Sequence, residues 1–169
     1  MNTSTTNTFF TPKFSYSSKN RLFVRLIFFI AISVWCFGFT CRSILPDSAY
    51  TAIASLFLKK IYGTVCHQHI EKTIFSGGNY FFVCARCTGI YFGALIASLN
   101  SLIILHRLPV KMKLLYISSV PMLIDVFSTT MGIYSYSKII ASLTGIFFGS
   151  AVFVYILAAL ENNFMDKSV

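Results

Sequence analysis

Four long apolar segments constrain most strongly what this chain can fold into. They run from about residue 22 to 41, 87 to 105, 114 to 133 and 139 to 160, and each is close to the length that an α-helix needs to cross a bilayer. Charged residues make up 11% of the chain, against about 25% in an ordinary soluble domain. The mean hydropathy of +0.72 agrees, and the sequence predicts an integral membrane protein.

The predicted fold class is all-α, with four transmembrane helices and one short additional helix. Ala49 to Tyr62 has a helical composition after the stop at Pro46 but is too short to cross, so we expect an interfacial or re-entrant helix there. Residues 1–20 are rich in Ser, Thr and Asn, which predicts a flexible cytoplasmic tail. Residues 21–169 then form a single membrane domain.

The positions of Lys and Arg predict the orientation in the membrane. Residues 13–25 carry four of them, and the short connection 106–113 between the second and third spans carries three. Because such residues concentrate on the cytoplasmic side, we expect both termini in the cytoplasm and residues 42–86 outside. The expected location is the cell membrane, crossed several times.

The net charge of +9 raises the question of nucleic-acid binding. The basic residues lie at the ends of the apolar segments, and no polar segment combines a basic patch with interleaved aromatic residues. Attraction to the anionic inner leaflet explains them. The expected partner is therefore the lipid bilayer, and nucleic acid is excluded.

The second and fourth spans share the motif Thr-Gly-Ile-aromatic-Phe-Gly. Gly89 and Gly93 in the second span, and Gly145 and Gly149 in the fourth, each form a Gly-x-x-x-Gly pair. Such pairs let helix backbones approach closely in a bilayer. We expect the second and fourth helices to contact each other, and the same faces could join two copies of the chain.

The external segment concentrates the residues that could carry chemistry. Cys66 and His67 precede a glycine turn, and Cys84 and Cys87 follow it. A Cys-x-x-Cys pair with a second ligand pair one loop away is the sequence outline of a zinc site. Because adjacent side chains point in different directions, Cys66 and His67 need not both bind, and His69 or Asp125 could complete the shell. We expect a metal ion there, with zinc favoured over iron or copper. Four protein ligands would close the site, and three would leave a position for water.

The same cysteines also suit redox chemistry. Cys87 lies at the start of the second span beside Arg86, and both the helix dipole and the guanidinium lower a thiol pKa. A four-helix membrane protein with an external Cys-x-x-Cys resembles in outline the disulfide-forming quinone reductases. This resemblance implies an alternative function, a thiol-disulfide oxidoreductase that uses Cys84 and Cys87 with a quinone. Its second redox pair would have to come from the other cysteines: Cys36, Cys41 and Cys66.

Asp125 is the one acid inside an apolar span, where a carboxylate costs about 2.5 to 3.5 kcal/mol. It should face the bundle, near the level of Cys87, Thr88 and Thr144. Two roles are open for it. One is a structural hydrogen bond to Thr88, to Thr144 or to a helix end. The other is a site role, in catalysis or in the passage of a proton or small ion.

Several strings of the chain together resemble a known family. They are Cys66-His-Gln, Cys84-Ala-Arg-Cys-Thr-Gly-Ile-Tyr91, the spacing from Pro121 to Asp125, and Thr144-Gly145. Over about residues 62–149 the pattern is similar to the prokaryotic membrane-protein family catalogued as domain of unknown function 2085. That family has Arg-Ser where this chain has Lys72-Thr73. Because the family has no assigned activity, the resemblance implies that these residues form a unit without saying what it does.

Overall fold

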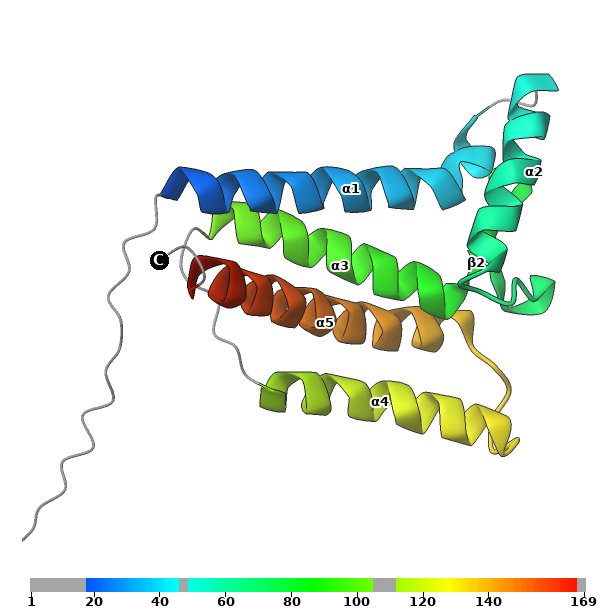
Figure 1. Ribbon diagram of the computed structural model, residues 1–169. Coiled ribbons are helices and arrows are strands. Elements are labelled where there is room, and N and C mark those ends of the chain that lie inside the picture. The colour runs from blue at the N-terminus through cyan, green and yellow to red at the C-terminus, as the bar shows by residue number, and fades with distance from the viewer. Residues whose placement is uncertain (1–17, 46–48, 105–111, 167–169) are drawn as a thin grey trace, which may run out of the picture.

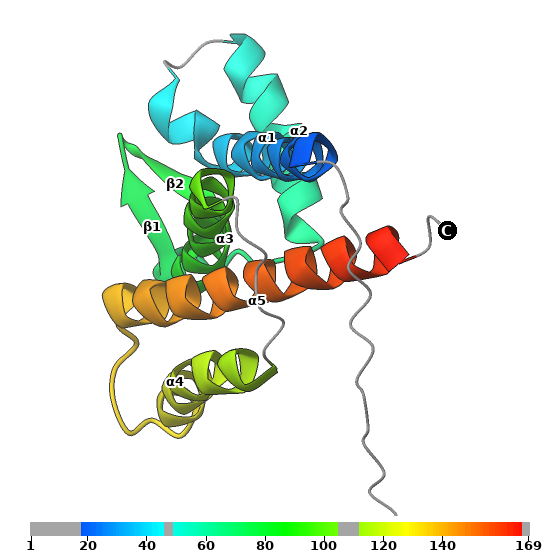
Figure 2. The same ribbon diagram turned by 90° about the vertical axis from the view of Figure 1, so that its left-hand side faces the viewer.

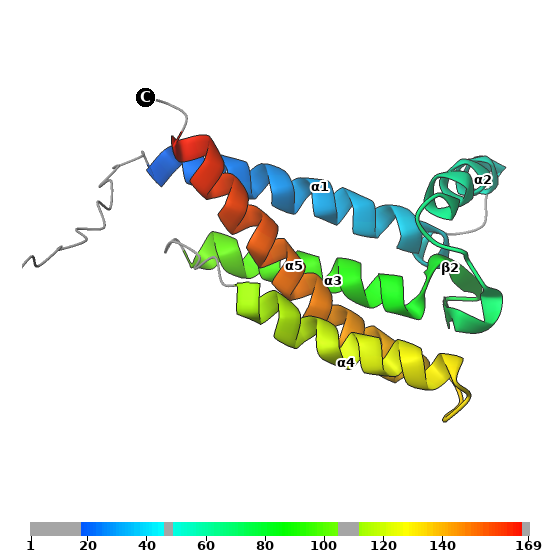
Figure 3. The same cartoon turned by 60° about the horizontal axis from the view of Figure 1, so that its bottom comes forward.

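The computed structural model describes residues 18–45, 49–104 and 112–166, which are mostly helical. The elements in chain order are α1 (Ser18–Ile44), α2 (Ala49–Gly63), a 3-10 turn (Ile70–Lys72), β1 (Thr73–Ser76), β2 (Asn79–Cys84), α3 (Ala85–Ile103), α4 (Met112–Thr130) and α5 (Lys138–Asp166). The four long helices α1, α3, α5 and α4 lie in that spatial order, and α2 and the two strands cover one end of them (Figure 1). Two further views show that α5 crosses its neighbours obliquely (Figures 2 and 3).

Three of the described helices are long and apolar enough to cross a membrane. They are Arg21–Ile44, Met112–Thr130 and Lys138–Asn162, which correspond to the first, third and fourth expected spans. The second expected span, 87–105, falls on α3, which has 19 residues and is not among these candidates. Arg86 is the second residue of this helix, and Asn100 lies in its last turn. Four transmembrane helices are therefore not confirmed, whereas three candidate spans are.

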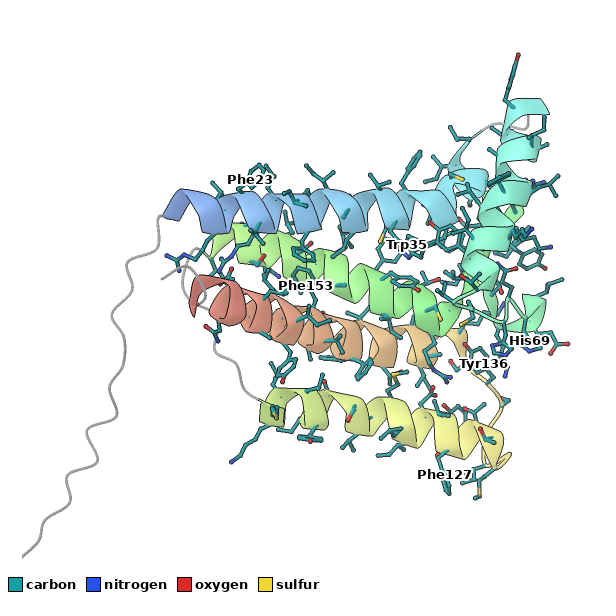
Figure 4. The ribbon with its side chains drawn as sticks, viewed as in Figure 1. Phe23, Trp35, His69, Phe127, Tyr136 and Phe153 are labelled. Atoms are coloured by element: carbon teal, nitrogen blue, oxygen red, sulfur yellow. The ribbon has the colours of Figure 1, made fainter. Side chains whose placement is uncertain are left out.

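The outer surfaces of these helices are apolar, as a bilayer requires. Phe23 on α1 and Phe127 on α4 point away from the bundle, whereas Trp35 and Phe153 point into it (Figure 4). Phe23 is 64% exposed and Phe153 only 7%. Many other apolar side chains of these helices are exposed as well. Because large exposed apolar patches are rare on soluble monomers, the surface agrees with a membrane location.

The expectation of an all-α protein is wrong for residues 73–84, which form a two-stranded antiparallel hairpin. Thr73 pairs with Cys84 and Phe75 with Tyr80. Gly77 and Gly78 make the turn with φ of +56° and +79°, a conformation that glycine adopts at little cost. Aromatic and β-branched residues on both sides of Gly-Gly are a hairpin signal, so the sequence held the information.

The short helix expected between the first two spans is α2, and it lies across the end of α1 (Figure 1). Four of its apolar side chains are more than half exposed: Tyr50, Ile53, Leu56 and Phe57. Residues 1–17 of the expected tail and residues 105–111 of the basic connection lie outside the described part of the chain. α1 already begins at Ser18.

The glycines of α3 and α5 lie where the two helices meet. A methyl group on Gly89 or Gly149 would overlap a backbone carbonyl oxygen of the facing helix, and so would one on Gly93. A methyl group on Gly145 would lie 2.6 Å from the carbonyl oxygen of Arg86. The two glycine faces thus cover each other within one chain, and a contact between copies would need another surface.

A buried arginine joins three helices at the end opposite the hairpin. Arg25 of α1 is 1% exposed and donates to both carboxylate oxygens of Glu161 on α5, at 2.6 and 3.1 Å. It also donates to the carbonyl oxygens of Ser101 and Ile104, at 2.6 and 2.8 Å. These carbonyls lie at the end of α3, where no further helical N–H group can donate to them. Arg25 therefore fixes the start of α1 against the ends of α3 and α5.

An aromatic core lies at the other end, beneath the hairpin and α2. Phe39 is fully buried, with the rings of Tyr62 and Tyr91 centred at 6.0 and 5.8 Å from its own. The Tyr62 hydroxyl donates to the carbonyl oxygen of Trp35 at 2.7 Å. These contacts fasten α2 to α1 and give the residues that follow α2 a rigid support.

Candidate metal centre

Three cysteines from two distant segments converge above this aromatic core. Cys66 follows α2, Cys84 ends β2, and Cys87 lies in the first turn of α3. Their sulfur atoms all lie within 4.8 Å of one another, and Cys66 is buried. The described residues hold no other group of three His, Cys, Asp or Glu side chains with this geometry.

Local structure explains the convergence. The backbone N–H of Cys66 donates to the Tyr62 carbonyl oxygen at 3.0 Å, which carries the chain one turn past α2. The hairpin then returns the chain, and the N–H of Cys84 donates to the Cys66 sulfur at 3.3 Å. Cys84 precedes α3 directly, so Cys87 follows it by three residues and lies on the same side of the helix.

The surroundings of Cys84 favour its thiolate. A hydrogen bond from the Cys87 side chain is the largest influence, and the backbone N–H groups of Cys87 and Arg86 act in the same direction. Against the opposing effect of burial, they lower the pKa of Cys84 to about 5. A thiolate is the form of cysteine that binds metals and attacks disulfides.

The two histidines lie outside the group of three cysteines. His67 and His69 are exposed, and their rings stack on each other with centroids 6.3 Å apart. Between them, Gln68 has a φ of +50°. This left-handed residue redirects the chain after Cys66. Figure 4 shows His69 at the outer end of the molecule.

Asp125 is buried, as expected, and its partner is an arginine. Its Oδ2 accepts from Nη2 of Arg86 at 2.5 Å, and its Oδ1 accepts from the Tyr134 hydroxyl. The structure gives Asp125 neither of the two threonine partners considered from the sequence, and the arginine that it does contact lies in the first turn of α3. The Thr88 hydroxyl donates to the Cys84 carbonyl of its own chain segment, and that of Thr144 donates within α5. The ion pair therefore ties α4 to the start of α3.

Tyr136 adds a side chain that the sequence did not single out. Its ring lies 5.9 Å from the guanidinium carbon of Arg86 and 5.5 Å from Nζ of Lys72, so two cations face it. Burial raises the pKa of Tyr136 to about 12, and the negative charge of Cys84 adds to this effect. Tyr134 and Tyr136 belong to a short connection with no motif, so no sequence signal marked them.

Comparisons with known proteins agree on a membrane protein without an assigned activity. Residues 66–155 match the family described as "Predicted membrane protein (DUF2085)". An uncharacterized protein of Methanocaldococcus jannaschii is 31% identical over 114 residues, which cover 65% of this chain and 72% of that protein. One from Methanothermobacter thermautotrophicus is 36% identical over 87 residues, covering 48% and 75%. No solved structure matches.

Proposed function

This chain belongs to the DUF2085 family of predicted membrane proteins, and we propose that it binds one metal ion, with zinc favoured, through Cys66, Cys84 and Cys87. One observation carries the proposal. Three cysteine sulfurs from segments 18 residues apart meet within 4.8 Å. Packing alone seldom gathers three thiols from separate segments, whereas a shared soft ion gives a reason for it.

The residues fit the group proposed. With zinc–sulfur bonds of about 2.3 Å, the sulfurs of a tetrahedral site lie about 3.8 Å apart. The sulfurs here lie within 4.8 Å of one another. Side-chain rotations that move the sulfur atoms by about one ångström would therefore bring them to the spacing of a zinc site. The N–H of Cys84 already donates to the Cys66 sulfur, and such a donor stabilises a metal-bound thiolate.

Three protein ligands leave a fourth position for water or for a substrate atom, which is the pattern of catalytic rather than structural zinc. His67 and His69 are exposed and stacked on each other, so either would join only after the segment around Gln68 moves. Arg86 lies between Cys84 and Cys87 in the chain, and its guanidinium is 5.9 Å from the ring of Tyr136, whose pKa the charge of Cys84 helps to raise.

The proposed setting of the site is the external surface of the cell membrane. In this arrangement α3 crosses the bilayer together with the three apolar helices, surrounded by α1 and α5. The start of α1 and the end of α5, which Arg25 and Glu161 join, would then face the cytoplasm. Labelling of the variants Tyr50→Cys and Asn162→Cys with an impermeant maleimide in intact cells would test this orientation, because both positions are exposed and only residue 50 should react.

Metal content tests the proposal directly. The full chain is purified in detergent without chelators, and zinc, iron and copper are measured for the wild type, Cys84→Ser and Cys66→Ser. Cys41→Ser is the matched control because Cys41 is partly buried but outside the group. We expect about one zinc per chain in the wild type and the control, and less than a tenth of that in the other two. Equal metal content in all four proteins would exclude the site.

A second function is favoured by the contact between Cys84 and Cys87. A thiolate at Cys84 hydrogen-bonded to the Cys87 thiol is the reduced form of a thiol pair that can be oxidised to a disulfide. From this thiolate and thiol, forming the S–S bond releases two electrons and one proton; a quinone would take these up, together with a second proton from water, to become a quinol. Here the quinone is the proposed oxidant.

Alkylation under non-reducing conditions separates the two functions. Metal-bound thiolates become alkylated after chelation, whereas a disulfide becomes accessible only after reduction. Release of Cys84 and Cys87 by a chelator alone would support the metal site. Release by a reductant alone, in protein without metal, would support the oxidoreductase. The transport function has less support because Asp125 is already neutralised by Arg86.

A further inference from the structure

A second site lies at the same end of the molecule, between α1, α2 and the hairpin. It is a pocket of about 350 Å³. Eleven residues line it: Arg42, Ser55, Leu56, Lys59, Gln68, Ile70, Thr73, Asn79, Tyr80, Phe81 and Phe82. Two of them are cationic and, among the described residues that form it, none is acidic. The pocket therefore presents two positive charges without an internal counter-ion.

The arginine of this pocket is held in place by neutral partners. Nε of Arg42 donates to Asn79 Oδ1 at 3.0 Å, and Nη1 donates to Ser55 Oγ at 2.7 Å. Ser55 is buried, with 5% of its surface exposed. Asn79 also donates to the Arg42 carbonyl oxygen at 3.3 Å. The guanidinium is thus fixed before any ligand binds, and the two described ion pairs of the chain involve other arginines.

Another residue that lines the pocket has a strained backbone. Gln68 has a φ of +50°, which residues other than glycine seldom adopt. Its side-chain amide donates to the Lys59 carbonyl oxygen at 2.8 Å, closing the end of α2 against the segment that follows it. Backbone strain of this kind is retained where surrounding contacts hold a functional shape.

The position of the pocket indicates where its ligand comes from. Arg42 lies two residues before the end of the candidate span Arg21–Ile44, the level at which lipid phosphates meet a spanning helix. Apolar side chains lead out of the pocket, with Leu56 71% and Ile70 65% exposed. A ligand with an anionic head and an apolar tail matches both parts.

We propose that this pocket binds the phosphate group of an anionic membrane lipid, with Arg42 and Lys59 contacting the phosphate oxygens. Arginine suits such a group because its fork of N–H donors matches phosphate geometry. The inference is independent of the metal site, since Cys66, Cys84 and Cys87 do not line the pocket.

Native mass spectrometry of the full chain tests this proposal. The protein in neutral detergent is titrated with dioleoylphosphatidic acid, with dioleoylphosphatidylcholine, or with phosphatidic acid in excess inorganic phosphate, and bound lipid is counted. The variants are Arg42→Gln and Lys59→Gln. Arg21→Gln is the matched control because it removes the same charge from the other end of α1.

We expect phosphatidic acid to bind the wild type and Arg21→Gln alike, and Arg42→Gln about tenfold more weakly, the loss for one hydrogen bond between charged groups. Lys59 is exposed on α2, so Lys59→Gln should fold normally and still weaken binding, which covers the case in which Arg42→Gln misfolds. Equal binding by wild type and Lys59→Gln, or an equal loss in Arg21→Gln, would overturn the proposal. Competition by inorganic phosphate would support the phosphate site and identify free phosphate as a second source.

Discussion

The buried ion pair between Arg25 and Glu161 should be the largest single electrostatic contribution to the stability of the bundle. Arg25 is 1% exposed and Glu161 7%. Replacing Arg25 with Met removes its hydrogen bonds to both carboxylate oxygens of Glu161 and to the last carbonyls of α3. Removing one partner of a buried pair leaves the other charge uncompensated and costs about 3 to 5 kcal/mol.

The companion variants should cost less. Glu161→Gln keeps a carbonyl that can accept from Arg25 but leaves the buried guanidinium without a counter-charge, so we expect a loss of about 2 to 4 kcal/mol. In the double variant Arg25→Met with Glu161→Met no buried charge remains. Its cost should therefore be smaller than the sum of Arg25→Met and Glu161→Met by about 1 to 3 kcal/mol. Arg21→Met, four residues earlier on the same helix, should change stability by about 0.5 kcal/mol or less.

Unfolding by sodium dodecyl sulfate in mixed micelles provides the assay. The chain has one tryptophan, and Trp35 lies in the aromatic core, 4.8 Å from the Tyr62 ring centroid, so its fluorescence reports loss of packing. The reasoning would be refuted if Arg25→Met cost less than about 1 kcal/mol. Strict additivity of the two single methionine variants would refute it equally, because coupling is the signature of a direct pair.

Three further predictions use the same unfolding assay. Gly149→Ala should lower the free energy of unfolding by about 1 to 3 kcal/mol because the new methyl group meets the carbonyl oxygen of Ile90 on α3. Gly63→Ala is the control and should cost less than half as much, because the nearest atoms to its new methyl group lie at 3.8 Å. Equal losses would contradict tight packing of α3 on α5. Asp125→Asn should lower the free energy of unfolding by about 1 to 3 kcal/mol, less than for a fully buried pair because its partner Arg86 is 21% exposed. It should also loosen α4, which faster proteolysis within α4 would show. Tyr62→Phe removes a hydrogen bond to α1 and should cost about 1 kcal/mol; no change in the unfolding midpoint would show that this bond contributes nothing.

Much of the local structure could be predicted because it depends on neighbouring residues. Hydropathy placed the helices now seen as α1, α4 and α5 within a few residues, and the stop at Pro46 marked the start of α2. Gly77-Gly78 signalled a turn, although the strands beside it were overlooked. The second expected span forms the helix α3, but α3 is not among the candidate spans of the described residues.

The candidate site was predicted in composition and only partly in geometry. The spacing of Cys84 and Cys87 put them on one side of a helix start, and Cys66 joined them through the hairpin, as the ligand pattern suggested. His67 was included because it is adjacent to Cys66. Adjacent residues point in different directions, and the left-handed backbone of Gln68 then turns the histidines toward solvent.

The sequence by itself determined which segments are helical and apolar, which small residues permit close helix packing, and which two cysteines lie three residues apart. Each of these features depends on a short stretch of chain. Only the tertiary structure decided that Asp125 pairs with Arg86, that Arg25 pairs with Glu161, and that Arg42 lies in a pocket without an acid. The two ion pairs join residues 39 and 136 positions apart. Their partners are selected by the crossing of whole helices, since a buried charge accepts whichever opposite charge the packing brings within reach.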